Sequence, residues 1–197
     1  MTDAKQEPEI AAELQAIFER LEDAGRCVWK REVRILHWAR AGKVHTLRAD
    51  FIAQIDGSPL LAFEVKRAPQ KAADLGRHLL QCVDYAKCQV APATADRVVP
   101  SWVSQPIRAS FMFSDWAAMP PFVREHAAKA RRLFGPARVG FAFNTKRYGL
   151  RLTLTHETIF WQELDYNGES RERFNGSLIH QGERVGNGSF NGEWNDQ

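Results

Sequence analysis

The chain has 197 residues, with 27 basic and 24 acidic side chains and 44% hydrophobic residues, which fits one globular domain with appendages. No stretch reaches the ~18 uninterrupted apolar residues of a membrane helix, and the opening nine residues are polar, unlike a signal peptide. We therefore expect a cytoplasmic protein with no membrane partner. The cysteines Cys27, Cys82 and Cys88 form no Cys-x-x-Cys pair, which argues against a disulfide framework and a zinc knuckle.

The charges are distributed unevenly along the chain. Residues 1–26 have a net charge of −4, residues 27–164 a net charge of +10, and residues 165–197 a net charge of −3. A basic central segment favours a polyanionic partner, of which a nucleic acid backbone is the commonest. On charge alone, a basic domain that binds no polyanion is an equally good interpretation.

The first half of the chain predicts helix, strand, strand, strand, helix. In order, these elements are a helix over Pro8 to Gly25, strands over Val28 to Trp38, His45 to Ile55 and Pro59 to Lys66, and a helix over Gln70 to Lys87. In the strand from His45 to Ile55 the odd-numbered positions from Leu47 onward are apolar. This alternation predicts a strand with one buried face.

The second half predicts a loop-rich crossover over residues 88–106, followed by strands and one helix. These are a strand over Ile107 to Phe113, a helix over Pro120 to Phe134, and a hairpin of Val139 to Phe143 with Leu150 to Trp161. Residues 1–165 are predicted to form one domain, and the Gly- and Asn-rich residues 166–197 a partly mobile tail. The order of elements predicts the α/β class, with a central mixed sheet flanked by helices on both faces.

The predicted hairpin brings two carboxylates together. Glu64 and Lys66 are two positions apart on a strand, so they share a face. If residues 56–58 form the turn, Ile55 pairs with Pro59, and the register places Asp50 opposite Glu64. A two-residue turn would mix polar and apolar faces, so the pattern favours the three-residue turn.

Two facing carboxylates repel each other unless a cation lies between their oxygens. A ligand set made only of oxygen suits Mg²⁺ or Mn²⁺ better than zinc. A divalent ion there can lower the pKa of a bound water and shield the charge of a phosphoryl transition state, while a lysine ammonium orients the nucleophile. The pattern therefore indicates phosphodiester hydrolysis. The alternative is a solvated ladder of surface ion pairs.

These residues resemble a known group of enzymes. Asp50, the Glu64-Val65-Lys66 tripeptide, and Gln81 with Tyr85 on the following helix are similar to the PD-(D/E)XK nuclease superfamily, including the Gln-x-x-x-Tyr element of its RecB-like branch. The resemblance covers residues 8 to about 113 and implies a restriction-endonuclease-like core of order αβββαβ. Ala49 replaces the proline that precedes the aspartate in many members, which affects backbone shape and not ligation.

The resemblance also implies roles for individual residues. Asp50, Glu64 and the Val65 carbonyl would bind the metal, and Lys66 would assist the attacking water. Gln81 would support the site, although a helix-surface amide is the alternative for this residue. An acidic residue of the first helix would lie near the metal; Glu13 is the best candidate and Glu9 is nearly as good.

Four further residues are expected to bind DNA. The resemblance implies that Tyr85 touches the DNA strand, and Arg77 and His78 lie on the same helical face as Gln81 and Tyr85. Arg67 and Lys71 follow Lys66 closely in the sequence and are candidates for gripping phosphates.

The sequence thus predicts a metal-dependent deoxyribonuclease that uses Mg²⁺ or Mn²⁺ and leaves a 5′-phosphate, as the resemblance implies. One alternative is a catalytically inactive DNA-binding or assembly module of the same fold. A second alternative, a hydrolase of small phosphate esters, is disfavoured by the basic central segment. Cutting both strands generally needs two active sites, so a homodimer is one expectation; the choice between endo- and exonuclease stays open.

Overall fold

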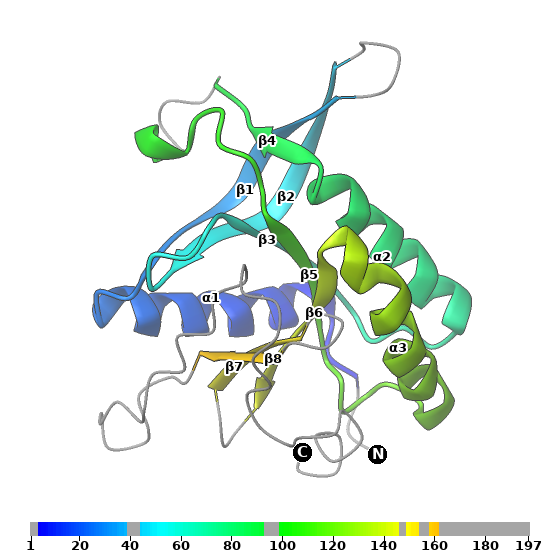
Figure 1. Ribbon diagram of the computed structural model, residues 1–197. Helices are drawn as coiled ribbons and strands as arrows, with labels where there is room; N and C mark the ends of the chain where they lie inside the picture. Colours follow the sequence, from blue (N-terminus) through cyan, green and yellow to red (C-terminus); the bar gives the residue numbers. More distant parts are fainter. Residues whose placement is uncertain (1–3, 39–43, 93–98, 146–148, 154–157, 162–197) are drawn as a thin grey trace.

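The computed structural model describes residues 4–38, 44–92, 99–145, 149–153 and 158–161. The described residues form one mixed β-sheet with helices on both faces (Figure 1). The α/β class and the mixed sheet flanked by helices are therefore confirmed. The predicted tail, residues 166–197, lies outside the described residues. No helix in the described part of the chain is long and apolar enough to cross a membrane.

The helices and strands follow the predicted order with two additions. They are α1 (Glu7–Asp23), β1 (Cys27–Trp38), β2 (Val44–Ile55), β3 (Leu61–Lys66), α2 (Ala72–Tyr85), β4 (Cys88–Val90), β5 (Ala109–Ser114), α3 (Pro121–Phe134), β6 (Val139–Thr145), β7 (Gly149–Thr153) and β8 (Thr158–Trp161), with short 3₁₀ turns at Pro100–Trp102 and Gly135–Ala137. The first addition is β4, inside the predicted crossover. The second is β8: the predicted strand from Leu150 to Trp161 is two antiparallel strands, because Leu150 pairs with Trp161.

The strands are arranged in the order β4-β1-β2-β3-β5-β6-β7-β8. The pairs β3–β5 and β5–β6 are parallel, and the other neighbours are antiparallel. The parallel pairing means that α2 and α3 are the crossover helices of the two parallel connections. The carboxyl ends of β3 and β5 therefore lie at the same edge, with Lys66 opposite Ser114.

Helix α1 covers one face of the sheet. Its apolar stripe, Ile10, Leu14, Ile17, Phe18 and Leu21, is buried against Phe51 of β2 and Phe63 of β3. The helix begins with the Glu9 carboxylate accepting a hydrogen bond from the Gln6 N–H at 2.7 Å, which satisfies a free donor of the first turn. Gly25, at φ 68°, follows its end, as the sequence predicts.

Helices α2 and α3 cover the opposite face. Leu75, Leu79 and Cys82 of α2 share a buried cluster with Val123 and Ala127 of α3. Figure 1 shows the two helices side by side, with α1 crossing the far side of the sheet. Since successive residues of a strand point to opposite faces, Phe63 of β3 packs toward α1 while Glu64 faces α2.

The hairpin of β1 and β2 bends in the middle. Arg31 pairs with Phe51 and Val33 with Ala49, but no pair is formed between Glu32 and Asp50, and Glu32 has a left-handed φ of 55°. A non-glycine residue in this region is unusual in a strand. The alternation of faces changes here, because Phe51 is buried under α1 whereas Ala49 is buried in the cluster on the other side.

The prediction of one buried face for β2 is therefore wrong in part. The odd-numbered residues from Ala49 to Ile55 are buried, but on two different sides of the sheet, and Ile52 is buried as well. A central strand that lies between helices on both faces loses the simple polar–apolar alternation.

Candidate active site

The turn between β2 and β3 sets the register that the sequence predicts. Phe51 pairs with Phe63, and Ala53 pairs with Leu61, the same register that places Asp50 opposite Glu64. Gly57 has a φ of 73° and Asp56 a φ of 49° within the turn. The predicted register is thus confirmed.

Asp50 lies where β2 leaves β3. The backbone pairs between these strands end at Phe51, and one position further the Asp50 carboxylate accepts a hydrogen bond from the Val65 N–H at 2.8 Å. The side chain therefore replaces the backbone carbonyl that a continuing strand would supply. This contact fixes the carboxylate beside the backbone that joins Glu64 to Lys66.

Glu64 is a buried carboxyl group with two side-chain partners. It is 2% exposed, it pairs with the Lys66 ammonium, and it accepts a hydrogen bond from the Tyr85 hydroxyl at 2.8 Å. Burial, followed by the charge of Asp50, raises the pKa of Glu64 above its usual value, and together they outweigh the opposing effect of Lys66. The two carboxylates therefore repel each other, and Lys66 offsets part of this repulsion.

Lys66 stays protonated beside these acids. Burial alone would lower its pKa, but the hydrogen bond and charge of Glu64, with the charges of Asp50 and Glu7, raise the pKa overall. Its side chain keeps 19% of its surface exposed. The ammonium is therefore a charged group that keeps contact with solvent.

Tyr85 and Gln81 form a chain of hydrogen bonds behind Glu64. The Gln81 amide donates to the Tyr85 hydroxyl at 2.9 Å, and that hydroxyl lies 2.8 Å from Glu64 Oε2 and 2.7 Å from the Arg48 carbonyl. One hydroxyl proton serves one of these two oxygens at a time. Burial and the Glu64 charge raise the pKa of Tyr85, so it remains a donor at neutral pH.

The position of Tyr85 changes the role expected for it. The side chain is 2% exposed, so in this structure it contacts Glu64 and has no surface for a DNA strand. Gln81 is half-buried and bonded to Tyr85, and the alternative of a free surface amide does not hold. Both residues hold the Glu64 carboxylate in position.

The three basic candidates for DNA binding are exposed. Arg67 and Lys71 follow β3, and Arg77 lies on α2. Arg77 forms an ion pair with Asp74 at 2.9 Å, so part of its charge is neutralised. The structure leaves Arg67 and Lys71 accessible next to Lys66 in the chain.

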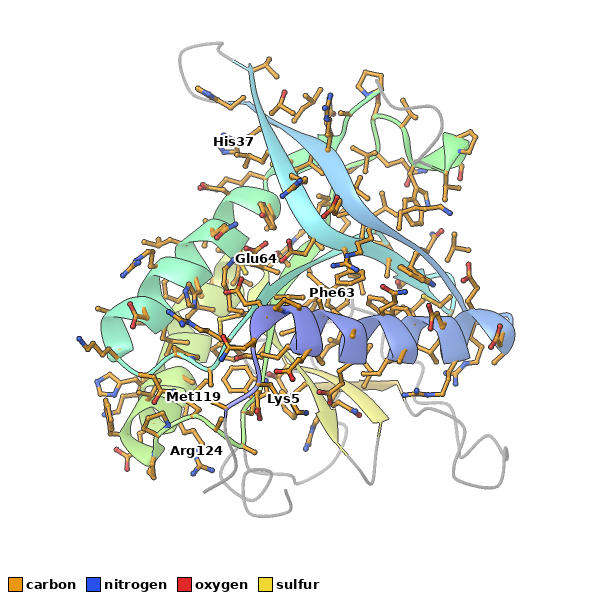
Figure 2. All side chains as sticks on the ribbon, turned by 180° about the vertical axis from the view of Figure 1, so that it is seen from behind. Lys5, His37, Phe63, Glu64, Met119 and Arg124 are labelled. Carbon is orange, nitrogen blue, oxygen red and sulfur yellow. The ribbon has the colours of Figure 1, made fainter. Side chains whose placement is uncertain are left out.

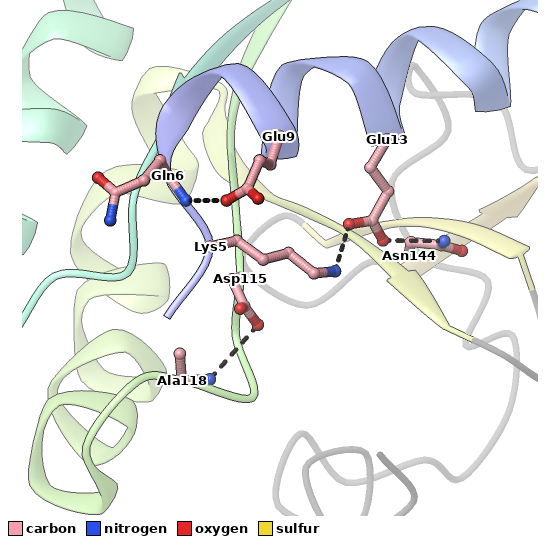
Figure 3. A network of polar contacts seen from close by, with 7 residues as sticks. All are labelled: Lys5, Gln6, Glu9, Glu13, Asp115, Ala118 and Asn144. Carbon is pink, nitrogen blue, oxygen red and sulfur yellow. Dashed lines mark hydrogen bonds and ion pairs between the residues drawn. The ribbon is translucent and has the colours of Figure 1, made fainter. Parts of the chain in front are cut away.

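Glu13 is bonded to residues outside the predicted metal site. Figure 3 shows its carboxylate bonded to Lys5 at 2.7 Å and to the Asn144 amide at 3.1 Å, in a network with no contact to Asp50 or Glu64. The hydrogen bond with Glu13 raises the pKa of Lys5. Glu9 caps the start of α1 instead.

Glu7 is the acidic residue of α1 whose charge acts on Lys66 and on His78. It stands at the first position of the helix, and the N-terminal end of α1 lies near Glu64 in Figure 2. The first turn therefore reaches the site, whereas Glu13 lies almost two turns further along. The signal in the sequence is Pro8, because proline is favoured in the first turn of a helix and therefore marks Glu7 as lying at the helix start.

His78 is a residue that the predicted catalytic set does not contain. It is half-buried on α2, one turn before Gln81, and its Nδ1 is enclosed without a hydrogen-bond partner. Burial and then the charge of Lys66 lower the pKa of His78. The sequence indicates this position of His78, because a residue three positions before Gln81 and seven before Tyr85 lies on the same face of a helix.

The cysteines are structural. Cys27, Cys82 and Cys88 are free and buried, and burial raises the pKa of each thiol to about 12. Protonated buried thiols are poor nucleophiles and poor metal ligands.

The donor set at the site fits a hard divalent cation. Asp50 and Glu64 supply carboxylate oxygens, which are the ligands that such a cation prefers. Within the described ranges, no group of three or more His, Cys, Asp or Glu side chains is arranged to hold a metal. A cation held here would therefore take its remaining ligands from backbone oxygen and water.

Comparisons with known proteins give no match: no family model, no curated protein and no solved structure is similar to this chain.

Proposed function

We propose that this chain is a metal-dependent DNA nuclease with a restriction-endonuclease-like core of the PD-(D/E)XK type. The observation that carries the proposal is the junction of β2 and β3, where Asp50 binds the Val65 N–H and the residues on either side of Val65, Glu64 and Lys66, form an ion pair. The bond from Gln81 to Tyr85, and from Tyr85 to Glu64, supports the RecB-like branch.

The chain's own residues have distinct roles in this proposal. Asp50, Glu64 and the Val65 carbonyl would hold Mg²⁺ or Mn²⁺, which supplies an acidic bound water and positive charge near the phosphate. Lys66 orients the attacking water and stabilises charge on the phosphoryl oxygens. Tyr85 fixes the rotamer of Glu64, and Gln81 orients the Tyr85 hydroxyl.

DNA is the preferred substrate class because residues 27–164 carry a net charge of +10, and because Arg67 and Lys71 are exposed beside the site. A strongly basic segment fits a polymer of phosphates better than a small ester.

The test is cleavage of linear and circular DNA with Mg²⁺ and with Mn²⁺. We expect Lys66→Gln and Asp50→Asn to reduce the rate by about 100-fold or more, as for loss of a group that stabilises transition-state charge. The matched control is Lys129→Gln, an exposed lysine on α3, which should cut at the wild-type rate. Binding of DNA without cleavage under any divalent ion would instead identify an inactive module of the same fold.

A further inference from the structure

Two arginines lie directly opposite each other on the β1–β2 ribbon. Arg34 of β1 pairs with Arg48 of β2, in the part of β2 that has separated from β3 and is paired with β1 alone. Figure 2 shows this ribbon extending past Glu64 toward His37. The pair therefore stands on a projection beside the candidate active site.

The two side chains point away from the core. Their strand neighbours Val33, Ile35 and Ala49 are buried in the cluster that contains Tyr85, whereas Arg34 and Arg48 are exposed. Successive residues alternate between the faces of a strand. The arginines thus occupy the open face of the ribbon.

The structure provides little negative charge for this pair. Arg48 lies 3.9 Å from Glu32, with 66% and 46% of the two side chains exposed, which is a weak, solvated contact. Within the described residues, no ion pair or hydrogen bond involves the Arg34 guanidinium. Like charges directly opposite each other destabilise a strand pair.

The other end of the same hairpin is different. There Arg26 forms two hydrogen bonds with the Asp56 carboxylate, at 3.1 and 2.7 Å. An arginine with a structural role is thus matched to an acid in this hairpin. The pair at Arg34 and Arg48 has the opposite character, and an external anion would relieve the repulsion.

The position of the pair indicates which anion. Arg48 is two residues from Asp50 in the sequence, across the bend at Glu32. The Tyr85 hydroxyl also lies 2.7 Å from the Arg48 carbonyl and 2.8 Å from Glu64. This residue fixes the backbone at Arg48 relative to the acidic site.

We propose that Arg34 and Arg48 bind the sugar–phosphate backbone of a DNA strand beside the candidate active site. This inference rests on the proposed nuclease function and extends it to the position of the substrate. Two guanidinium groups on one face present paired donors that match the oxygens of a phosphate.

The test measures DNA binding in EDTA, so that no cleavage is needed. A fluorescent 20-base-pair duplex is titrated at several salt concentrations with the wild type and with the double variant Arg34→Gln/Arg48→Gln. We expect the variant to bind about tenfold more weakly, and the slope of log K against log salt to fall by about 1.8, as for loss of two phosphate contacts.

The matched control is Arg108→Gln/Arg138→Gln, two exposed arginines at the amino ends of β5 and β6, at the edge of the sheet opposite Lys66. Any loss of two positive charges weakens nonspecific attraction to DNA slightly. Apart from that small effect, this variant should keep the wild-type slope of log K against log salt. If both double variants give the same slope and affinity, the inference is wrong.

Thermal unfolding excludes a merely structural explanation. Because removal of facing like charges relieves repulsion, Arg34→Gln/Arg48→Gln should melt at or above the wild-type temperature. Arg34→Lys/Arg48→Lys keeps the charge and should retain most of the slope. If the wild type cleaves DNA but Arg34→Gln/Arg48→Gln binds DNA as tightly as the wild type does, this inference alone is contradicted. If the wild type does not cleave DNA but the variant binds it more weakly, only the proposed chemistry is contradicted.

Discussion

At the scale of single residues, the proposed chemistry depends on how Glu64 is held. Its carboxylate is buried between the Lys66 ammonium and the Tyr85 hydroxyl, and Asp50 binds the adjacent backbone. The sequence predicts Asp50, Glu64 and Lys66 through strand alternation and hairpin register, because both follow from local geometry. It does not predict the partner of Tyr85, which lies 21 residues away and depends on how α2 packs.

Tyr85→Phe should lower both stability and activity. The change removes the donor to Glu64 and the acceptor for Gln81 while keeping the ring in place, so buried polar atoms lose their partner. We expect a loss of about 1–3 kcal/mol in the free energy of unfolding, measured by urea denaturation, together with weaker cation binding. Thr153→Val removes another buried hydroxyl, one bonded to the Phe141 carbonyl at 3.4 Å, and should leave cation binding unchanged; equal effects of both variants on cation binding would argue against a role for Tyr85.

His78 should make the stability of the protein sensitive to acid. Burial and the charges of Lys66 and Arg77 lower its pKa from 6.5, while Asp74 and Glu7 oppose the shift. The unfolded chain therefore binds more protons than the folded one just below pH 6.5, and this contribution to stability is lost as the pH falls through that range. The slope due to one such group cannot exceed about 1.4 kcal/mol per pH unit.

The measurement compares unfolding free energies of the wild type and His78→Gln between pH 8 and pH 5. Below pH 6.5 the free energy of unfolding should fall less in His78→Gln than in the wild type. His45→Gln, at an exposed histidine of β2, is the control and should track the wild type; a His78→Gln variant that also tracks the wild type contradicts the prediction.

At the scale of elements, the β2–β3 turn is the part that positions the acids. The sequence predicts this turn because Asp56, Gly57 and Ser58 suit it and because the flanking residues alternate. It does not predict the bend at Glu32, the strand β4, or the division of residues 150–161 into two strands. These features depend on pairing with distant strands, which a local pattern does not encode.

A substitution at Gly57, with one at Gly76 as the control, tests the importance of the turn. Gly57 has a φ of 73° and Gly76 lies within α2, and an added Cβ would meet no atom within 4 Å at either position. Gly57→Ala should therefore destabilise the protein by about 1–2 kcal/mol through backbone strain alone, while Gly76→Ala should stabilise it by up to about 1 kcal/mol. Thermal and urea unfolding check both signs; a neutral Gly57→Ala would show that the left-handed turn does not control the hairpin.

At the scale of the whole molecule, the mixed sheet between α1 and the pair α2–α3 gathers residues from distant parts of the chain at the end of β3. The α/β class is predictable because helix periodicity, turn residues and strand alternation agree. The sequence does not show which turn of α1 lies nearest the carboxyl end of β3, so it favours Glu13 over Glu7. Glu7, at the helix start, acts on Lys66 instead.

The central claim is that Asp50 and Glu64 share a divalent cation, and calorimetric titration with Mn²⁺ tests it most directly. We expect one site in the wild type, with at least a tenfold loss of affinity in Asp50→Asn and in Glu64→Gln, and no change in Asp84→Asn, an exposed aspartate at the end of α2. Mn²⁺ binding that is absent from the wild type, or that is equally strong in Asp50→Asn and Glu64→Gln, would contradict the account.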